Sequence, residues 1–181
     1  CTSPDMQLIC GQGDLFSAPG THFCEVGLVG HIQASPGYVT LKSKDPLEHP
    51  RVEPHYLSAS VDIQRMAEGL KVASEIYKQD PDMFGLDYIS TSLGWEEAAV
   101  KEFVLQVTHT IWHPVGTCKM GPRSDPLAVV DERLKVYGTQ GLRVADASIM
   151  PVIPSTNTDQ PSRMIGYHLA DLILEESRDA L

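Results

Sequence analysis

Apolar residues near the start of the chain follow the pattern of β-strands. A largely apolar run extends from 23 to 32, and a second run, rich in β-branched and aromatic residues, covers 38–42. Turn-forming residues occupy 34–37 between them, so the pattern predicts a β-hairpin. The next segment, 45–54, holds three prolines and is expected to be extended and irregular.

Apolar residues then recur at three- and four-residue steps, which is the spacing of one face of an α-helix. Ser58 or Ser60 can cap the start of this helix, and Asp80-Pro81 is expected to end it. The stripe that should face the core comprises Ile63, Met66, Leu70, Ala73 and Tyr77.

A second helix is predicted to begin near Ser92. Glu96 and Glu97 then lie in its first turn, where negative charge suits the helix dipole. This helix leads the chain directly to His113. Its expected buried face comprises Val100, Phe103, Val104 and Val107.

The remainder of the chain predicts short strands followed by one long helix. The strands are expected at 129–130, 134–137 and 142–145, with glycines marking the turn between the last two. A helix is expected over 161–176, with Pro161 in its first turn. Its expected apolar face comprises Met164, Ile165, His168, Leu169, Leu172 and Ile173.

Composition narrows the function classes. The chain has 181 residues, 42% of them hydrophobic and 21% charged, which is typical of a globular protein. Its net charge of -10 argues against a nucleic-acid partner. No apolar run approaches the length of a membrane span. The four cysteines fit neither a zinc pattern nor a disulfide scaffold, and the histidines show no metal-binding spacing, so no metal is expected.

The chain begins abruptly at Cys1 without a signal region, and we interpret this start as a cut. Its single asparagine, Asn157, gives no N-glycosylation acceptor. The sequence therefore leaves the compartment open.

Three residues are candidates for chemistry, each with an ordinary alternative. His113 precedes a proline and could act in acid–base catalysis or form a hydrogen bond in the core. Asn157 could face an electron-rich ligand atom or stabilise a turn before a helix. Asp146 follows a predicted strand and could contact a cofactor or cap the next turn. A nucleophile pair of Cys118 and His113 lacks an orienting third group.

Five elements in order carry a resemblance to a known family. They are 37–41 with Asp45-Pro46 downstream, 112–121 (WHPVGTCKMG), 128–131, 141–151 and 170–173. This series resembles the glucose-methanol-choline (GMC) oxidoreductases, flavoenzymes that oxidise alcohols. The resemblance covers roughly residues 20 to 176 and is sharpest over 112–173.

The resemblance implies roles for particular residues. His113 would take the alcohol proton as hydride leaves for the flavin N5, and an imidazole suits that task near neutral pH. Asn157 would hold the substrate oxygen. The residues implied to contact the FAD are Trp112, Asp146 and Ala147, with the backbone of Asn157 and Thr158. The chain departs from the family pattern at Thr156 and at Asp159-Gln160, where a carboxylate puts the redox tuning of the site in doubt.

The resemblance also implies an organisation. The implied fold class is α+β. Residues 1–111 would form the substrate-binding domain, an antiparallel sheet backed by helices. Residues 112–181 would complete a Rossmann-like FAD domain with a strand at 142–145 and a helix at 161–176. The rest of that domain would lie in an N-terminal part that is missing here and acts as the partner of this chain. The chain should therefore expose apolar surface and bind FAD weakly when alone.

The leading hypothesis is FAD-dependent oxidation of a small-molecule alcohol. Two others stay open. A flavin-containing hydroxynitrile lyase of the same family would use His113 for proton transfer without net redox change. A catalytically inactive fragment would act only as an interaction module.

Overall fold

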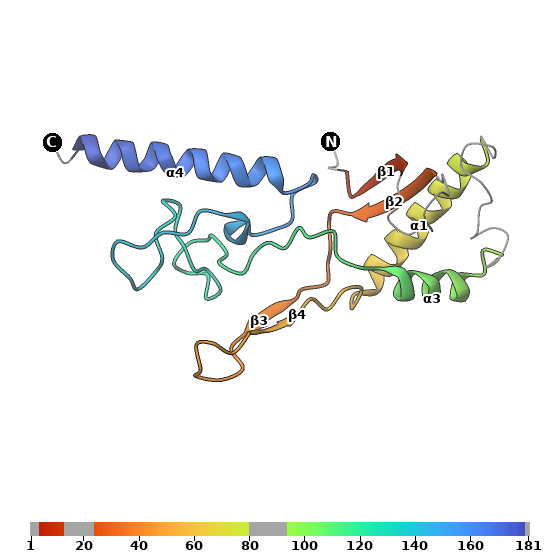
Figure 1. The fold of residues 1–181 in the computed structure, drawn as a ribbon, viewed down its shortest axis with the longest axis horizontal. Coiled ribbons are helices and arrows are strands. Elements are labelled where there is room, and N and C mark those ends of the chain that lie inside the picture. Colours follow the sequence, from red (N-terminus) through yellow and green to blue (C-terminus); the bar gives the residue numbers. More distant parts are fainter. Residues whose placement is uncertain (1–3, 13–23, 80–93, 180–181) are drawn as a thin grey trace. The chain divides into compact units, whose positions relative to one another are not determined.

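In a computed structural model, the structure describes residues 4–12, 24–79 and 94–179. The chain divides into two compact units (Figure 1). The first unit comprises residues 1–37 and 52–111, and the second comprises 38–51 and 112–181. Assignment of substrate binding to residues 1–111 and cofactor binding to 112–181 stays a prediction.

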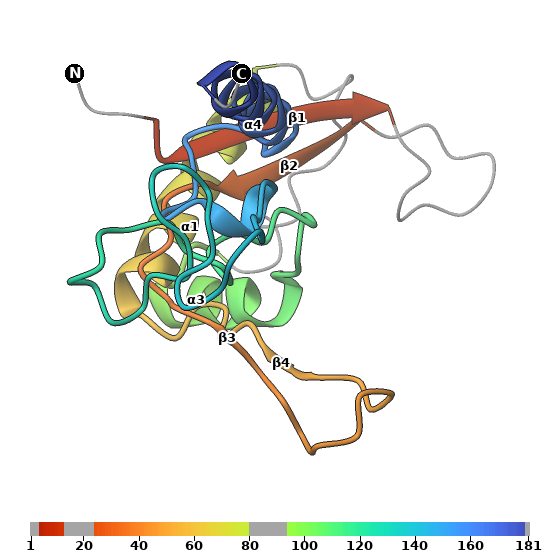
Figure 2. The same cartoon turned by 90° about the vertical axis from the view of Figure 1, so that its left-hand side faces the viewer.

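The first unit contains an antiparallel pair of strands, β1 (Met6–Gln12) and β2 (Cys24–Gly30) (Figure 2). Their register places Met6 opposite Gly30. The predicted hairpin of 23–32 with 38–42 is therefore wrong, because the partner of the first run lies upstream of it. An apolar pattern reports which residues are buried but does not name the neighbouring strand.

The run at 38–42 pairs elsewhere. Its strand, β3 (Tyr38–Thr40), pairs with β4 (Arg51–Glu53) in a second two-stranded sheet. The chain at Gly37 approaches the end of β4 so closely that a Cβ there would lie 2.6 Å from the Glu53 carbonyl oxygen. A glycine is required at that position. The irregular segment predicted at 45–54 thus contains one short strand.

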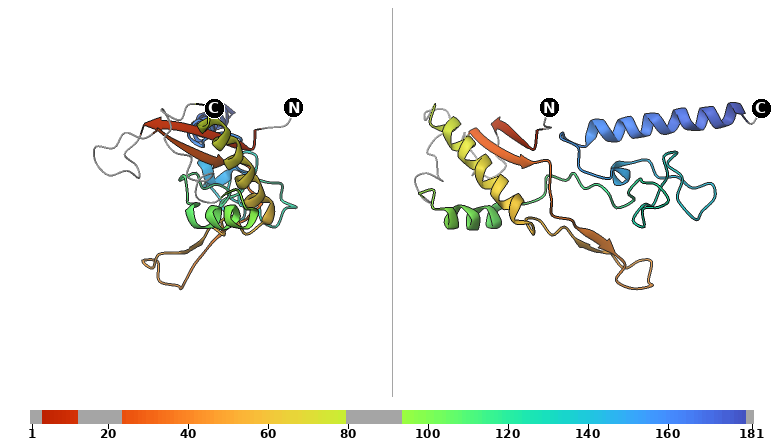
Figure 3. Two further views of the ribbon diagram at one scale, coloured as in Figure 1. Left: turned by 90° about the vertical axis from the view of Figure 1, so that its right-hand side faces the viewer. Right: turned by 180° about the vertical axis from the view of Figure 1, so that it is seen from behind.

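Helix α1 (Ser60–Tyr77) carries most of the predicted stripe and contacts both β2 and α3, as Figure 3 shows. Ala73 is buried, and Gly69 packs directly against side chains of the strand pair. The predicted serine caps are wrong. Ala59 is the N-cap, and no side chain caps the first turn. The expected end at Asp80-Pro81 lies outside the described residues.

A buried carboxylate organises the start of α1. The Asp62 side chain is completely buried. It accepts hydrogen bonds from the Ala34 amide at 2.9 Å and from the Ser35 amide at 2.9 Å. The Ser35 hydroxyl also donates to Asp62, and it accepts a hydrogen bond from the Ala59 amide at 3.0 Å. Asp62 therefore connects the 34–35 loop to α1.

Helix α3 (Glu97–Val107) follows, with Glu96 as its N-cap. Val100 and Val104 are buried as predicted, but Val107 is 48% exposed and the prediction for it is wrong. Val107 is the last helical residue, so the chain turns away before the stripe is completed. The predicted start near Ser92 is wrong, because the helix begins at Glu97 after a turn at Gly94 and Trp95, and Glu96 precedes the first turn.

The second unit is built around a small apolar core. This core comprises Val130, Leu134, Ile149 and Leu172. Within the described residues, the strands predicted at 129–130, 134–137 and 142–145 appear only as isolated bridges, such as Lys135 to Arg143. Positive φ angles at Leu134, Gly138 and Gly141 turn the chain too often for a continuous ladder. The strand expected at 142–145 to join the sheet of the missing N-terminal part stays a prediction, since within this chain the segment forms only the bridge from Arg143 to Lys135.

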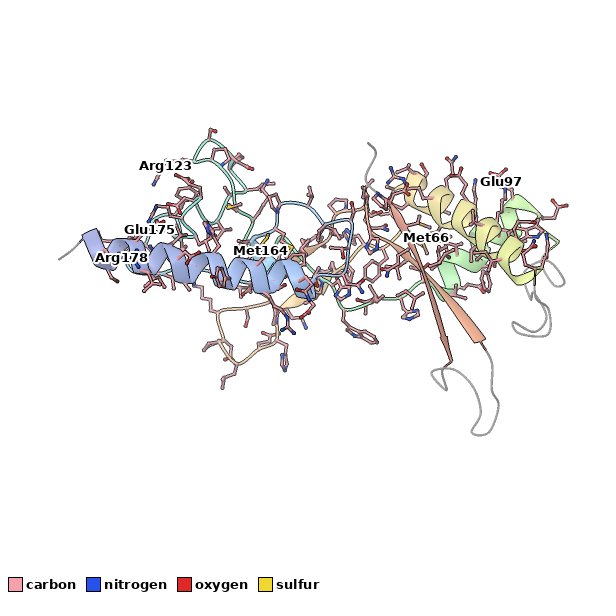
Figure 4. All side chains as sticks on the ribbon, turned by 90° about the horizontal axis from the view of Figure 1, so that it is seen from above. Met66, Glu97, Arg123, Met164, Glu175 and Arg178 are labelled. Atoms are coloured by element: carbon pink, nitrogen blue, oxygen red, sulfur yellow. The ribbon has the colours of Figure 1, made fainter. Side chains whose placement is uncertain are left out.

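Helix α4 (Asp159–Asp179) begins two residues before the predicted start and has Pro161 in its first turn, as predicted. Leu172 is buried, and Ile165 and Leu169 pack against the core. Met164 (labelled in Figure 4) is 68% exposed and Ile173 is 45% exposed, so only part of the predicted apolar face packs against this core. His168 is also exposed.

Small antiparallel sheets together with α1, α3 and α4 make the fold a mixture of helix and strand. Among the residues that the structure describes, no helix has both the length and the apolar character needed to cross a bilayer.

Candidate active site

The backbone on both sides of His113 is constrained. Trp112 has a φ angle of 59°, a left-handed conformation that non-glycine residues rarely adopt. Pro114 restricts His113 itself to extended conformations. Gly116 has a φ angle of 88°, which glycine adopts without strain. These residues fix the direction in which the His113 side chain leaves the backbone.

The segment after His113 lies against a short 3-10 helix, η2 (Ala147–Ile149). The Cys118 amide donates to the Ser148 carbonyl at 2.9 Å, and the Met120 amide donates to the Ile149 carbonyl at 2.8 Å. These bonds bring the His113 segment and the segment with Ala147 together.

A side-chain contact then connects His113 to the start of α4. Thr158 Oγ1 lies 2.8 Å from His113 Nδ1, within hydrogen-bonding distance. Thr158 is buried, with 7% of its surface exposed. Asn157 is adjacent to Thr158 in the chain, so residues 45 positions apart in the sequence share one site.

Asn157 carries an unpaired buried atom. Its Oδ1 is buried and has no hydrogen-bond partner among the described residues. A buried acceptor left without a donor costs about 1–3 kcal/mol, so such atoms point to a ligand or to a functional role.

The other predicted contacts are placed differently. The Asp146 carboxylate accepts a hydrogen bond from the Ser148 amide at 2.8 Å and caps η2, as the structural alternative expected. Ala147 is the first residue of η2. The Trp112 side chain is 75% exposed. Their predicted contacts with a cofactor stay predictions.

Charge near the site is balanced locally. Asp159, which the sequence marked as an unusual carboxylate, accepts hydrogen bonds from Arg163 Nε at 3.1 and 3.0 Å. Sequence reasoning missed this arginine, although the four-residue spacing in a helix could have revealed it. Beside the site segment, the Lys119 ammonium holds the pKa of Asp125 below its usual range through a 2.6 Å contact.

These features fit a flavin. The first turn of α4 presents backbone N–H groups and the positive end of the helix dipole, which suit an electron-rich ring edge. The unpaired Asn157 oxygen can take a donor from a ligand. In the part of the chain that the structure describes, no three His, Cys, Asp or Glu side chains gather into a metal site.

Known proteins resemble this chain over most of its length. The sequence profile described as GMC oxidoreductase matches residues 33–166. An uncharacterized GMC-type oxidoreductase of Mycobacterium bovis is 38% identical over 179 residues, or 94% of this chain. Glucose dehydrogenase [FAD, quinone] of Drosophila pseudoobscura pseudoobscura is 40% identical over 147 residues, or 77% of this chain. The structure of a formate oxidase variant from Aspergillus oryzae RIB40 matches 97% of this chain with a TM-score of 0.79 and 29% identity.

The chain spans only a part of each of these proteins. It covers 34% of the mycobacterial protein, 24% of the glucose dehydrogenase and 32% of the formate oxidase. The chain belongs to the GMC oxidoreductases, and it corresponds to their C-terminal domain.

Proposed function

We propose that this chain supplies the proton acceptor and the substrate-orienting amide for the FAD-dependent oxidation of an alcohol. One observation carries the proposal: His113 is joined to Thr158, next to Asn157, whose buried amide oxygen has no partner in the described chain. An imidazole whose hydrogen-bond partner is the chain neighbour of an unpaired amide suits a substrate that carries a hydroxyl group.

His113 and Asn157 would have different roles in the reaction. His113 Nδ1 is occupied by Thr158, so Nε2 is the nitrogen that would accept the hydroxyl proton. The Asn157 amide has an oxygen acceptor and an NH2 donor at nearly equivalent positions, so rotation about χ2 allows it to hold the substrate oxygen in either role. FAD, when bound, supplies the hydride acceptor.

The remaining predicted residues would hold the cofactor. Ala147 is the first residue of η2 and Asp146 caps it, and η2 is hydrogen-bonded to the segment that follows Trp112 and His113. The backbone of Asn157 and Thr158 leads into α4, where N–H groups face away from the helix. The N-terminal part of the enzyme would supply the other FAD contacts, and it is the proposed partner of this chain.

The test uses the full-length, flavin-loaded protein that carries this sequence. Single-turnover reduction of the flavin is followed anaerobically by its visible absorbance with a panel of primary alcohols. His113→Ala is expected to slow reduction by about 10²- to 10⁴-fold, the usual contribution of a general base. His49→Ala, at an exposed loop position, is the matched control and should reduce at the wild-type rate.

Other outcomes would point elsewhere. Unchanged flavin reduction in His113→Ala would remove His113 from proton transfer and end the proposal. Turnover of a cyanohydrin without flavin reduction would favour the lyase. Protein that binds flavin yet processes no substrate would favour an interaction module.

A further inference from the structure

We infer that Thr158 is a positioning residue that fixes the protonation state of His113 through its side chain. Its hydroxyl oxygen accepts a hydrogen bond from His113 Nδ1–H, which leaves Nε2 unprotonated and ready to accept a proton. The inference rests on the proposed function, because it assigns a tautomer to the proposed base.

Thr158 is held rigidly enough for this task. Its carbonyl oxygen accepts hydrogen bonds from the Ser162 amide at 3.0 Å and from the Ser162 hydroxyl at 2.6 Å. The side chain is buried, so solvent offers few competing partners. The hydroxyl therefore stays 2.8 Å from His113 Nδ1.

The residues after Thr158 reduce the number of helix amides that its hydroxyl could cap. Thr158 occupies the N-cap position of α4, where a threonine normally bonds the amide of the second or third helical residue. The third helical residue here is Pro161, which has no N–H. One of the two usual donors is thus absent, and the hydroxyl contacts His113 instead.

The contact admits two hydrogen arrangements, and only one is compatible with catalysis. A neutral imidazole has one N–H group. If the Thr158 hydroxyl donated to Nδ1, the proton would sit on Nε2, which could not accept another. If Nδ1–H donates to Thr158, Nε2 keeps its lone pair. The same Nδ1–H bond then persists after Nε2 takes a proton, and it becomes a stronger, charge-assisted bond.

The first measurement is spectroscopic and does not depend on turnover. The flavin-loaded protein is labelled with ¹⁵N in its histidine rings, and His113→Gln identifies the His113 resonances. We expect Nε2 of neutral His113 to show the shift of an unprotonated nitrogen in wild-type protein and a tautomer mixture in Thr158→Val. A protonated Nε2 in the wild type would overturn the inference.

Kinetics provides the second measurement. Thr158→Val retains the side-chain shape but removes the hydroxyl, and it should lower kcat about 10- to 100-fold with KM changed less than about threefold. Thr158→Ser restores the hydroxyl and should recover kcat to within about threefold of wild type. An unchanged kcat in Thr158→Val, or loss of bound flavin from it, overturns the positioning role.

The two proposals fail in distinguishable ways. If His113→Ala abolishes flavin reduction while Thr158→Val leaves it unchanged, the proposed function stands and only the Thr158 inference fails. If His113→Ala has no effect, the proposed function itself fails.

Discussion

Asn157 is an unfavourable residue for stability alone. Its amide oxygen is buried without a donor among the described residues. The hydroxyl of the next residue, Thr158, contacts His113. Natural proteins leave few such atoms unpaired, since each forfeits its bond to water on folding. No hydrogen bond within the described residues offsets the cost of burying the Asn157 oxygen, so the residue is best explained by a ligand that it binds.

Replacement of Asn157 should therefore separate stability from activity. Asn157→Ala removes the unpaired oxygen, so its free energy of unfolding should stay within about 1 kcal/mol of wild type. Its kcat/KM should fall about 10- to 100-fold, because the proposed hold on the substrate oxygen is lost. On the full-length protein, urea denaturation measures the free energy of unfolding and steady-state kinetics measures kcat/KM. A variant that loses stability but not activity would assign Asn157 a structural role.

For single residues, the sequence indicates which side chains are candidates for the site but not which side chains contact one another. His113 and Asn157 stood in motifs, so both were singled out. The contact of His113 with Thr158 was not foreseen, because it joins segments 45 residues apart. Asp62 was missed for a similar reason. Its partners are backbone amides of a distant loop, and a carboxylate next to an apolar stripe gives no sign that it is buried.

Among the elements, α4 is anchored near its C-terminal end by charge. Glu176 lies 2.8 Å from Lys135 Nζ, 2.7 Å from Arg143 Nη2 and 3.1 Å from Arg133 Nε. Hydrogen bonds from Lys135 and then Arg143 lower the pKa of Glu176 to about 2. The cluster connects α4 to the segment that carries Leu134, a core residue, so it supports the helix that presents Thr158.

This cluster predicts a particular pH dependence. The folded pKa of Glu176 is depressed, so its stabilisation is fully present above about pH 4.5 and is lost as the pH falls toward about 2. Glu176→Gln should have a lower urea midpoint than wild type at neutral pH, and the difference should vanish across that window. Glu175→Gln serves as the control and should behave as the wild type, because the Glu175 carboxylate lies 3.7 Å from Arg133, beyond hydrogen-bonding distance. A constant difference down to pH 2 would contradict the assignment.

Helices were easier to predict than strands because their pattern is local. The apolar spacing in α1 and α4 reflects neighbours three or four positions away in the same helix. Strand pairing depends on a second segment, so the run that forms β2 was predicted to pair with the wrong strand. For the same reason strands were predicted at 129–130, 134–137 and 142–145, where the structure has only isolated bridges. Helix ends depended on tertiary contacts, as the loop bound by Asp62 shows at the start of α1.

At the scale of the whole molecule, α4 is apolar on two sides. One side contributes Leu172 to the core, with Ile165 and Leu169 packed against it. On the opposite side, Met164 is 68% exposed, Tyr167 is 75% exposed and Leu174 is 54% exposed. Spacings of three and seven residues place these three on one stripe. A surface helix normally has only one apolar side, so the second stripe suits a partner.

We predict that the N-terminal part of the enzyme covers this stripe. The chain alone should bind FAD weakly and enhance the fluorescence of a hydrophobic dye. Adding the separately expressed N-terminal part should suppress that fluorescence and restore flavin absorbance. Tyr167→Glu should weaken this association about tenfold or more, since burial of one large side chain contributes about 1.5–3 kcal/mol. Ser177→Glu, exposed on another side of α4, should associate normally. Equal affinities for both variants would place the partner surface elsewhere.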